Sequence, residues 1–162
     1  MDGGEDIESL YRRYFPLVRE KCRRMLADAE EATDVAQETF IRFWRARPEN
    51  LEPNQVTAWI YKTSTHLAVD RIRRRRPREP LNLESSTAYP VADAAATVDL
   101  RRLLAQVARY VPRRELEVAV LHRADGMDQN EIAEVTRLSA RTIRRLLTRF
   151  DERVTQLLKE DA

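Results

Sequence analysis

Residues 126–147 of the chain read GMDQNEIAEVTRLSARTIRRLL. Asp128 and Glu131 have the spacing of a capping box, which predicts that a short helix begins after Asp128. Three residues, 136 to 138, separate that helix from a second helix start at Ser139. A helix, a turn of three to four residues and a second helix form a helix-turn-helix, whose second helix enters the major groove of DNA. The stretch therefore predicts a DNA-binding helix pair.

The second helix of this pair has one apolar and one basic face. At about 100° per residue, its apolar side chains fall within about 100° of arc. They are Ile143, Leu146, Leu147, Phe150 and Val154, whereas Arg141, Arg144, Arg145 and Thr148 lie on the opposite side. A solvated surface helix has the same stripe, but it usually mixes Glu with Arg, and no Glu lies between residues 139 and 150. The pattern favours DNA binding.

Arginine dominates the basic residues of the whole chain. The 162 residues are room for one compact domain or two small ones, and they include 29 basic and 27 acidic side chains, for a net charge of +2. The charge is uneven, because residues 71–78 hold six Arg and residues 137–149 hold five, both without an acid. Guanidinium groups match phosphates and guanine edges, so these segments are compatible with nucleic-acid contact. A GC-rich genome would produce the same bias.

Helical periodicity continues over most of the chain and predicts an all-α fold. Residues 7–26 form an amphipathic helix or a helix pair, with Pro16 at a kink or a break. A second helix stops before Pro48, and a third covers about 55–76.

Residues 77–97 contain three Pro and no sustained period, which predicts a flexible linker. We therefore expect two small helical domains, 1–76 and 98–162, of which the second carries the helix-turn-helix. Within that second domain, Pro112 near a first turn and Gly126 just past an end mark the limits of another helix.

Enzymatic functions fit this sequence poorly. Its three glycines stand at 3, 4 and 126, so no Gly-rich loop is present to hold a phosphate. His66 and His122 lie in different modules and outside any HExxH pattern, and Cys22 sits on an apolar stripe, as a buried structural thiol does. We expect a protein that is not an enzyme and uses no metal and no cofactor.

The sequence also bears on the compartment. No apolar stretch approaches the roughly 20 residues of a membrane-spanning helix, and the N-terminal residues MDGGEDIESL are acidic, unlike a signal peptide. The single Cys22 excludes an internal disulfide, which indicates a reducing compartment. We expect an unexported protein of the cytoplasm that does not associate with membranes.

The predicted third helix has a second stripe beside its core arc. Lys62, His66, Val69, Arg73 and Arg76 advance by four and three residues and share this face. A solvated face with a basic tail explains the stripe equally well. His66 also fits a histidine at the edge of the core that bonds a backbone carbonyl.

Read together, the two modules resemble a bacterial RNA polymerase sigma factor of the extracytoplasmic-function (ECF) type. ATDVAQETFIRFW (32–44) is similar to the segment by which that family binds core polymerase. Residues 58–76 are similar to the helix that melts and reads the minus-ten promoter element, and residues 126–147 to the helix-turn-helix that reads the minus-thirty-five element. The resemblance covers nearly the whole chain, with three motifs in the right order.

The resemblance implies a sigma factor that binds core RNA polymerase and directs promoter-specific initiation by recognising and helping to melt promoter DNA. It implies that polymerase is bound by Asp34, Gln37, Glu38 and Arg42. It implies that minus-ten DNA is bound by Asn54, Lys62, His66, Arg71, Arg73 and Arg74, with a flipped base held by the loop 48–55. It implies that minus-thirty-five DNA is bound by Ser139, Arg141, Thr142, Arg144, Arg145 and Arg149. An anti-sigma factor is a further partner that the family leads us to expect.

The chain departs from the family pattern at a few positions. His66 stands where the family usually has Asn, at the pocket for a flipped base, and Thr33 replaces a common Glu. Arg137 replaces the usual turn Gly, next to Thr136 in place of an apolar residue. A positive φ at Arg137 would carry strain that Gly avoids.

Two other functions stay open at this point. A helix-turn-helix regulator without a sigma role would bind duplex DNA unaided. A sigma-like protein would occupy polymerase or an anti-sigma factor without supporting initiation, and His66 and Arg137 would then mark lost DNA function. An RNA-binding adaptor fits the charge, but the chain lacks the aromatic-rich sheet pattern of common RNA modules.

Overall fold

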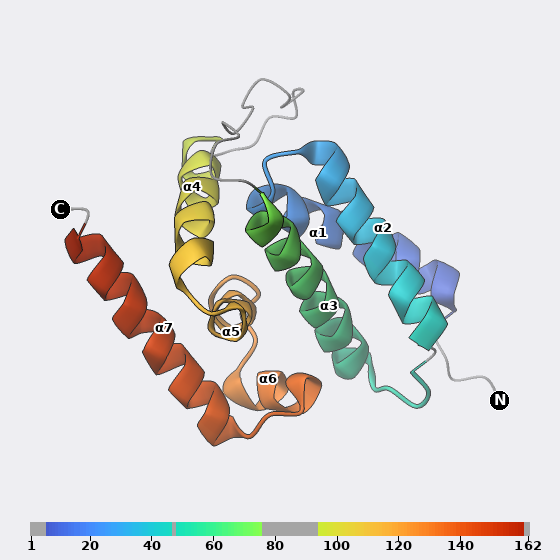
Figure 1. Cartoon of the computed structure of the whole chain (residues 1–162). Helices are drawn as coiled ribbons and strands as arrows, with labels where there is room; N and C mark the ends of the chain where they lie inside the picture. Colours follow the sequence, from blue (N-terminus) through green and yellow to red (C-terminus); the bar gives the residue numbers. More distant parts are fainter. Residues whose placement is uncertain (1–5, 47, 76–93, 161–162) are drawn as a thin grey trace.

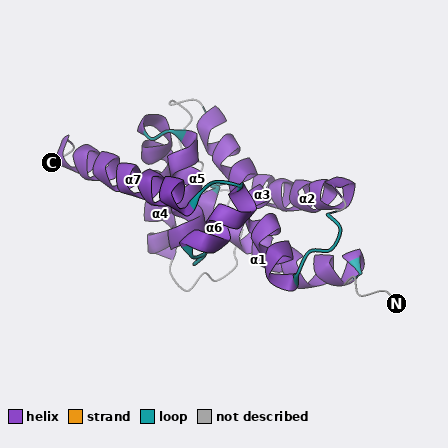
Figure 2. Cartoon of the chain, turned by 90° about the horizontal axis from the view of Figure 1, so that it is seen from below, coloured by secondary structure: helices purple, strands orange, loops and turns teal. Residues whose placement is uncertain are grey.

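The computed structural model describes residues 6–46, 48–75 and 94–160. Regular secondary structure in these residues is entirely α-helical, which confirms the predicted all-α class. The helices are α1 (Ile7–Met25), α2 (Ala29–Ala46), α3 (Pro53–Arg74), α4 (Ala94–Tyr110), α5 (Arg113–Arg123), α6 (Gln129–Thr136) and α7 (Ala140–Glu160). Figure 1 shows their arrangement, and Figure 2 shows the loops that connect them. None of these described helices has the length and apolar character that crossing a bilayer requires.

The first helix is continuous, although Pro16 lies inside it. A proline in a helix interior removes one hydrogen bond and costs about 3 kcal/mol. The apolar stripe of α1 offsets this cost, because Val18 and Cys22 are fully buried and Leu10 and Met25 nearly so. Of the two alternatives for residues 7–26, the single helix is confirmed.

Side-chain caps fix where α2 and α3 begin. Asp28 Oδ1 accepts two backbone N–H groups of the first turn of α2, at 2.8 and 3.2 Å. At the start of α3, Glu52 and Gln55 form a reciprocal capping box. The third helix therefore begins at Pro53, slightly before the predicted start near Gln55.

The C-terminal helices enclose a core of their own. α5, α6 and α7 surround Val118, Ala119, Leu121, Met127, Ile132, Ile143, Leu146 and Leu147. Pro112 is the N-cap of α5, and Gly126 follows that helix with φ 71°. Both predicted boundaries of this helix are therefore confirmed.

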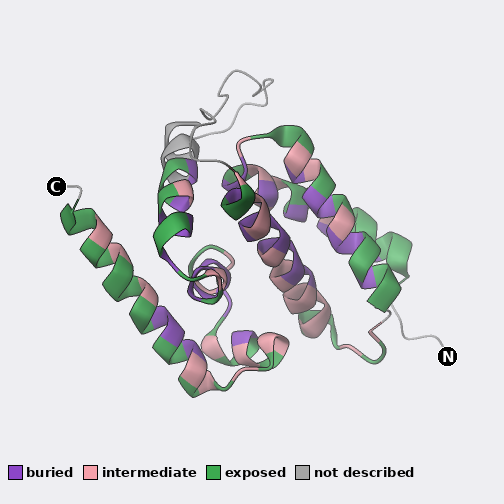
Figure 3. Cartoon of the chain, viewed as in Figure 1, coloured by how far each residue is buried: buried purple, intermediate pink, exposed green. Residues whose placement is uncertain are grey.

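The third helix is central in the molecule, between α1 and α2 on one side and α4, α5 and α6 on the other (Figure 1). Figure 3 shows that it is at least partly buried over most of its length. Thr63, Ser64 and Thr65 are consecutive and all buried. Because consecutive helical residues point about 100° apart, burial of three in a row means that more than one side of α3 is covered.

One apolar cluster joins both halves of the chain. Ile60 and Leu67 of α3 belong to the same cluster as Val107 of α4 and Leu116 and Val120 of α5. Residues 77–93 of the predicted linker lie outside the described residues. Its last positions, 94–97, belong to the helix α4. The domain boundaries 1–76 and 98–162 stay a prediction. In the structure, the helices on the two sides of residues 76–93 share a core.

Candidate functional site

The predicted helix-turn-helix consists of α6, a short turn and α7. Asp128 Oδ1 accepts the N–H groups of Asn130 and Glu131 at 2.8 and 2.9 Å, and Glu131 Oε2 accepts the Asp128 N–H at 2.8 Å. This is the capping box predicted from the sequence. Arg137 ends α6 in the left-handed backbone region, with φ 57° and ψ 29°. Gly is the usual residue at such a helix end. The condition for strain at this position is therefore met.

The seventh helix places its apolar face on α5 and α6 and its basic face in solvent (Figure 3). Ile143 is fully buried, and Leu146 and Leu147 nearly so. Arg141, Arg144, Arg145 and Arg149 are all exposed, and none of them forms an ion pair with a residue that the structure describes. Four guanidinium groups on one helix face are therefore available to an anionic partner.

The start of α7 is fixed by two residues of the same predicted set. Ser139 Oγ accepts the Thr142 N–H at 3.1 Å, and the two hydroxyl oxygens are 2.9 Å apart. Ser139 is exposed and Thr142 is half-buried. The six residues predicted for minus-thirty-five DNA thus lie on the first two to three turns of α7 and the residue before it.

A second surface lies between α2 and α3. A groove of about 430 Å³ is lined by Asp34, Gln37, Glu38, Ile41 and Arg42 of α2 and by Leu67, Asp70, Arg71 and Arg74 of α3. All four side chains predicted to bind polymerase are in this lining. Arg42 Nε donates to Glu38 Oε1 at 2.8 Å, which fixes both side chains on the rim. The groove is lined by carboxylates, one amide, guanidinium groups and two apolar side chains, Ile41 and Leu67.

The α3 residues predicted for minus-ten DNA do not share one surface. Arg71 and Arg74 line the groove just described, and Arg71 lies 3.7 Å from the carboxylate of Glu31 on α2. His66 and Arg73 contact the C-terminal helices, and Lys62 is half-buried. Asn54, in the first turn of α3, is exposed. The DNA-binding role of these residues stays a prediction.

A buried ion pair joins the two halves, and sequence reasoning did not find it. Lys21 Nζ of α1 lies 2.6 Å from Asp125 Oδ2, in the turn after α5, with side chains 10% and 4% exposed. Burial lowers the pKa of Lys21 and raises the pKa of Asp125, because desolvation penalises both charges more than the partner charge restores. The two residues are 104 positions apart, so no spacing in the sequence could have revealed the pair.

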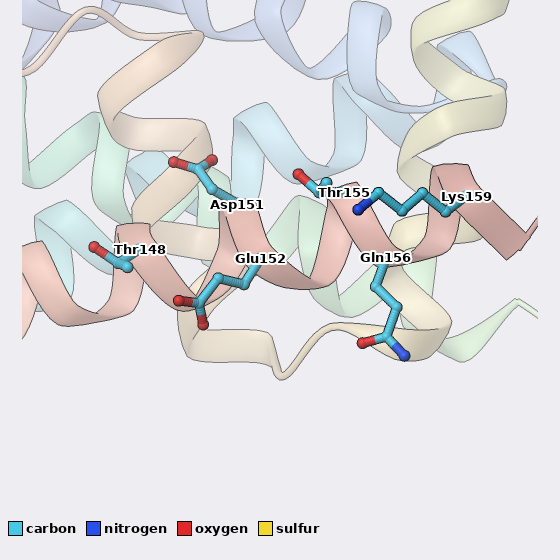
Figure 4. Close-up of a pocket in the computed structure, with 6 residues that line it drawn as sticks. All are labelled: Thr148, Asp151, Glu152, Thr155, Gln156 and Lys159. Atoms are coloured by element: carbon cyan, nitrogen blue, oxygen red, sulfur yellow. The ribbon is translucent and has the colours of Figure 1, made fainter.

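Figure 4 shows a hollow on α7 that contains none of the predicted site residues. Thr148, Asp151, Glu152, Thr155, Gln156 and Lys159 line it, and all six belong to α7. A single helix cannot surround a ligand, so this hollow is open helix surface. The candidate site therefore consists of the groove at α2, the third helix and the basic face of α7.

The chain is similar to known proteins over most of its length. Residues 10–78, which hold most of α1 and all of α2 and α3, match the family Sigma-70 region 2. The chain is 28% identical to the ECF RNA polymerase sigma factor SigW of Bacillus subtilis, over 98% of this chain and 90% of that protein. It is 27% identical to the RNA polymerase sigma factor CarQ of Myxococcus xanthus, over 98% of this chain and 93% of that protein.

A solved structure has the same fold. The structure of CnrH in complex with the cytosolic domain of CnrY superposes with a TM-score of 0.65 at 24% identity, covering 96% of this chain and 89% of that chain. The family match covers the helices that form the groove, and the relatives extend over the helix-turn-helix as well. Residues 10–78 thus match the Sigma-70 region 2 family, and over nearly its whole length the chain is similar to extracytoplasmic-function RNA polymerase sigma factors.

Proposed function

We propose that this chain directs promoter-specific transcription initiation, by binding core RNA polymerase and by recognising and helping to melt promoter DNA. The observation that carries the proposal is the presence of two separate surfaces of the right chemistry. The groove lined by Asp34, Gln37, Glu38 and Arg42 lies on the N-terminal half. The exposed arginines of a capped helix-turn-helix, which form no ion pair with any described residue, lie on the C-terminal half.

In this proposal the groove binds polymerase. Its four predicted side chains come from successive turns of α2, so a helix of the partner can run alongside them. Exposed charges at a rim set orientation and association rate more than affinity. The apolar contact therefore falls to Ile41 and Leu67, which lie in the same lining.

The basic face of α7 binds the upstream promoter element. Arg141 and Arg145 lie one turn apart, and such a pair can reach a guanine edge or two phosphates of the major groove. Phosphate contacts position the helix, and base-edge contacts provide sequence preference.

The third helix and the segment 48–55, whose last three residues form the start of α3, engage the minus-ten element. Extruding a base costs a few kcal/mol of stacking and pairing, which pocket contacts and cations along the single strand must offset. Lys62, Arg71, Arg73 and Arg74 supply these cations in the proposal. The further partner is an anti-sigma factor, which the similarity to this family implies.

The test is a binding experiment with purified components. The labelled chain is passed over a sizing column with core polymerase, with a promoter duplex, and with both. We expect a complex with polymerase alone and a larger complex when the duplex is added. Tight duplex binding without polymerase would favour a helix-turn-helix regulator, and polymerase binding with no capture of any promoter duplex would favour a sigma-like protein that does not initiate.

A further inference from the structure

Backbone hydrogen bonds fix the turn between α6 and α7 (Figure 1). The Leu138 N–H donates to the Ala133 carbonyl at 3.1 Å, and the Arg137 N–H donates to the Glu134 carbonyl at 3.4 Å. These two bonds form a Schellman motif, which requires one residue in the left-handed region. Arg137 is that residue, with φ 57°. The motif uses only main-chain atoms of Arg137, so its side chain is not needed to form the turn.

The side chain of Arg137 has no polar partner within the described part of the chain. Arg137 is exposed, and it forms no ion pair and no side-chain hydrogen bond with a described residue. The conformational cost of a Cβ in the left-handed region is therefore not offset by any such contact of this side chain.

The other described residues with positive φ are of types that suit this conformation. Asn50 has φ 58°, and asparagine is several-fold enriched in the left-handed region. Gly126, which follows α5, has φ 71° and carries no Cβ. Arg137 alone among them combines a long charged side chain with this backbone, so its guanidinium is the feature to be explained.

Arg137 lies at the edge of the basic face of α7. It precedes Ser139, which caps α7, by two positions, so their Cα atoms are at most about 7 Å apart. In a helix-turn-helix, the N-terminal residues of the second helix contact base edges inside the major groove. A cation just before that helix therefore lies near the phosphates that border the groove. No acidic residue stands between Arg137 and Asp151 to compete for it along this stretch.

We propose that Arg137 contacts a backbone phosphate of the promoter and thereby positions α7 in the major groove from the turn that precedes it. The inference rests on the proposed function, because it requires that α7 binds the upstream element. Gly, the usual residue at such a helix end, has no side chain to make this contact. A phosphate contact carries no sequence information, so Arg137 adds affinity and orientation, and base preference remains with residues such as Arg141 and Arg145.

The inference predicts that stability and DNA affinity change in opposite directions. Arg137→Gly removes the strain and the guanidinium together, whereas Arg137→Gln keeps the Cβ and removes the charge. Arg137→Lys keeps both the Cβ and a charge. We expect Arg137→Gly to unfold about 1–4 °C above the unmodified chain and yet to bind promoter DNA more weakly. If Arg137 acted only through the fold of the turn, the more stable variant would bind DNA at least as well.

The experiment measures how tightly the complex of the chain with core polymerase binds a promoter duplex, at a series of salt concentrations. Each phosphate contact contributes about 0.9 to the slope of log affinity against log salt concentration. We expect Arg137→Gly and Arg137→Gln to reduce this slope by about 1 and the affinity about five- to tenfold at about 0.1 M salt. The loss should shrink as the salt concentration rises. Arg137→Lys should keep the slope and most of the affinity.

Two controls separate a phosphate contact from other effects. Arg102→Gln removes one charge from an exposed position of α4, outside the helix-turn-helix, and should leave the slope unchanged. Duplexes with single base changes in the upstream element provide the second control. The loss caused by Arg137→Gly should be the same on all of them, since a phosphate is present whatever the base.

The outcomes distinguish this inference from the proposed function. Unchanged affinity and slope in both Arg137→Gly and Arg137→Gln would overturn the inference, and so would an equal loss in Arg102→Gln. The proposed role of α7 would stand in either case if Arg141→Ala with Arg145→Ala still weakens promoter binding. If that double variant binds like the unmodified chain, or if the polymerase complex captures no duplex, the proposed function and the inference are both wrong.

Discussion

Arg137 is held in the left-handed region between α6 and α7, with φ 57°. For a residue with a Cβ this conformation costs about 1–2 kcal/mol. We expect Arg137→Gly to raise the free energy of unfolding by about 0.5–1 kcal/mol, because the lost strain outweighs the added freedom of the unfolded chain. Thermal unfolding of the two proteins measures the change. Arg137→Ala keeps the Cβ and should give no gain, and equal stability of the Gly and Ala variants would show that the turn is unstrained.

Arg141 and Arg145 test the DNA face at the level of single side chains. We expect Arg141→Ala with Arg145→Ala to weaken promoter-dependent transcription strongly, because each lost base-edge contact is worth about 1–3 kcal/mol. Polymerase association should be nearly unchanged, since both residues lie on the solvent face of α7. Transcription from a fixed promoter measures the first effect, and a pull-down measures the second.

The matched control removes the same charge elsewhere in the C-terminal half. Arg102 and Arg114 are exposed and lie on α4 and α5, so they are not part of the basic face of α7. Replacing both with Ala should leave promoter output close to that of the unmodified chain. If the two double variants lose output equally, net charge rather than the α7 face explains binding.

Among the helices, α2 carries the most direct test of polymerase binding. Asp34→Ala with Gln37→Ala removes two side chains from the groove lining. We expect the dissociation constant for core polymerase to rise about tenfold or more, as for truncations at the centre of an interface. Glu30→Ala removes one charge from the first turn of α2, outside the groove, and should have no such effect. Unchanged co-purification of the double variant would refute the groove assignment.

The helices themselves could largely be predicted, because their signals are local. The capping box of Asp128 and Glu131 and the alternation of apolar and basic residues on α7 depend on residues within two turns of each other. The effect of Pro16 was ambiguous, because a proline inside a helix is tolerated only when packing offsets its cost. The apolar stripe of α1 alone does not show that α1 packs on α2 and α3.

The environment of α3 could not be predicted in the same way. Its stripe of Lys62, His66, Val69 and Arg73 fitted a solvated face and a DNA face equally well, yet Val69 is fully buried. The C-terminal half packs on part of that face, through contacts such as Arg73 with the Ala108 carbonyl and His66 with Glu117. Contacts between residues so distant in sequence leave no periodic pattern. The basic face of α7 could therefore be predicted from the sequence, whereas the packing of the C-terminal half on α3 could not.

At the scale of the whole molecule, the shared core predicts that the two halves unfold together. Leu116 of α5 is 1% exposed and belongs to the cluster that includes Ile60 of α3. We expect Leu116→Ala to lower the free energy of unfolding by about 2–5 kcal/mol. Trp44 and Trp59, the two tryptophans, lie in α2 and α3, so tryptophan fluorescence reports the N-terminal half alone. In Leu116→Ala, the unfolding midpoint measured by tryptophan fluorescence should fall to lower denaturant together with the midpoint measured by circular dichroism.

An exposed leucine of the same half provides the control. Leu158 of α7 is 59% exposed, and Leu158→Ala should leave both midpoints in place. If Leu116→Ala shifts the circular dichroism midpoint but not the tryptophan midpoint, the halves do not share a core in solution.

Run-off transcription tests the central claim, that this chain acts as a sigma factor and directs initiation through these surfaces. Core polymerase and a pool of genomic promoter fragments from the same source are incubated with and without the purified chain. We predict transcripts from discrete start sites that appear only when the chain is added, and that share a sequence upstream of each start. Tight polymerase binding with no added transcript from any fragment would contradict the claim.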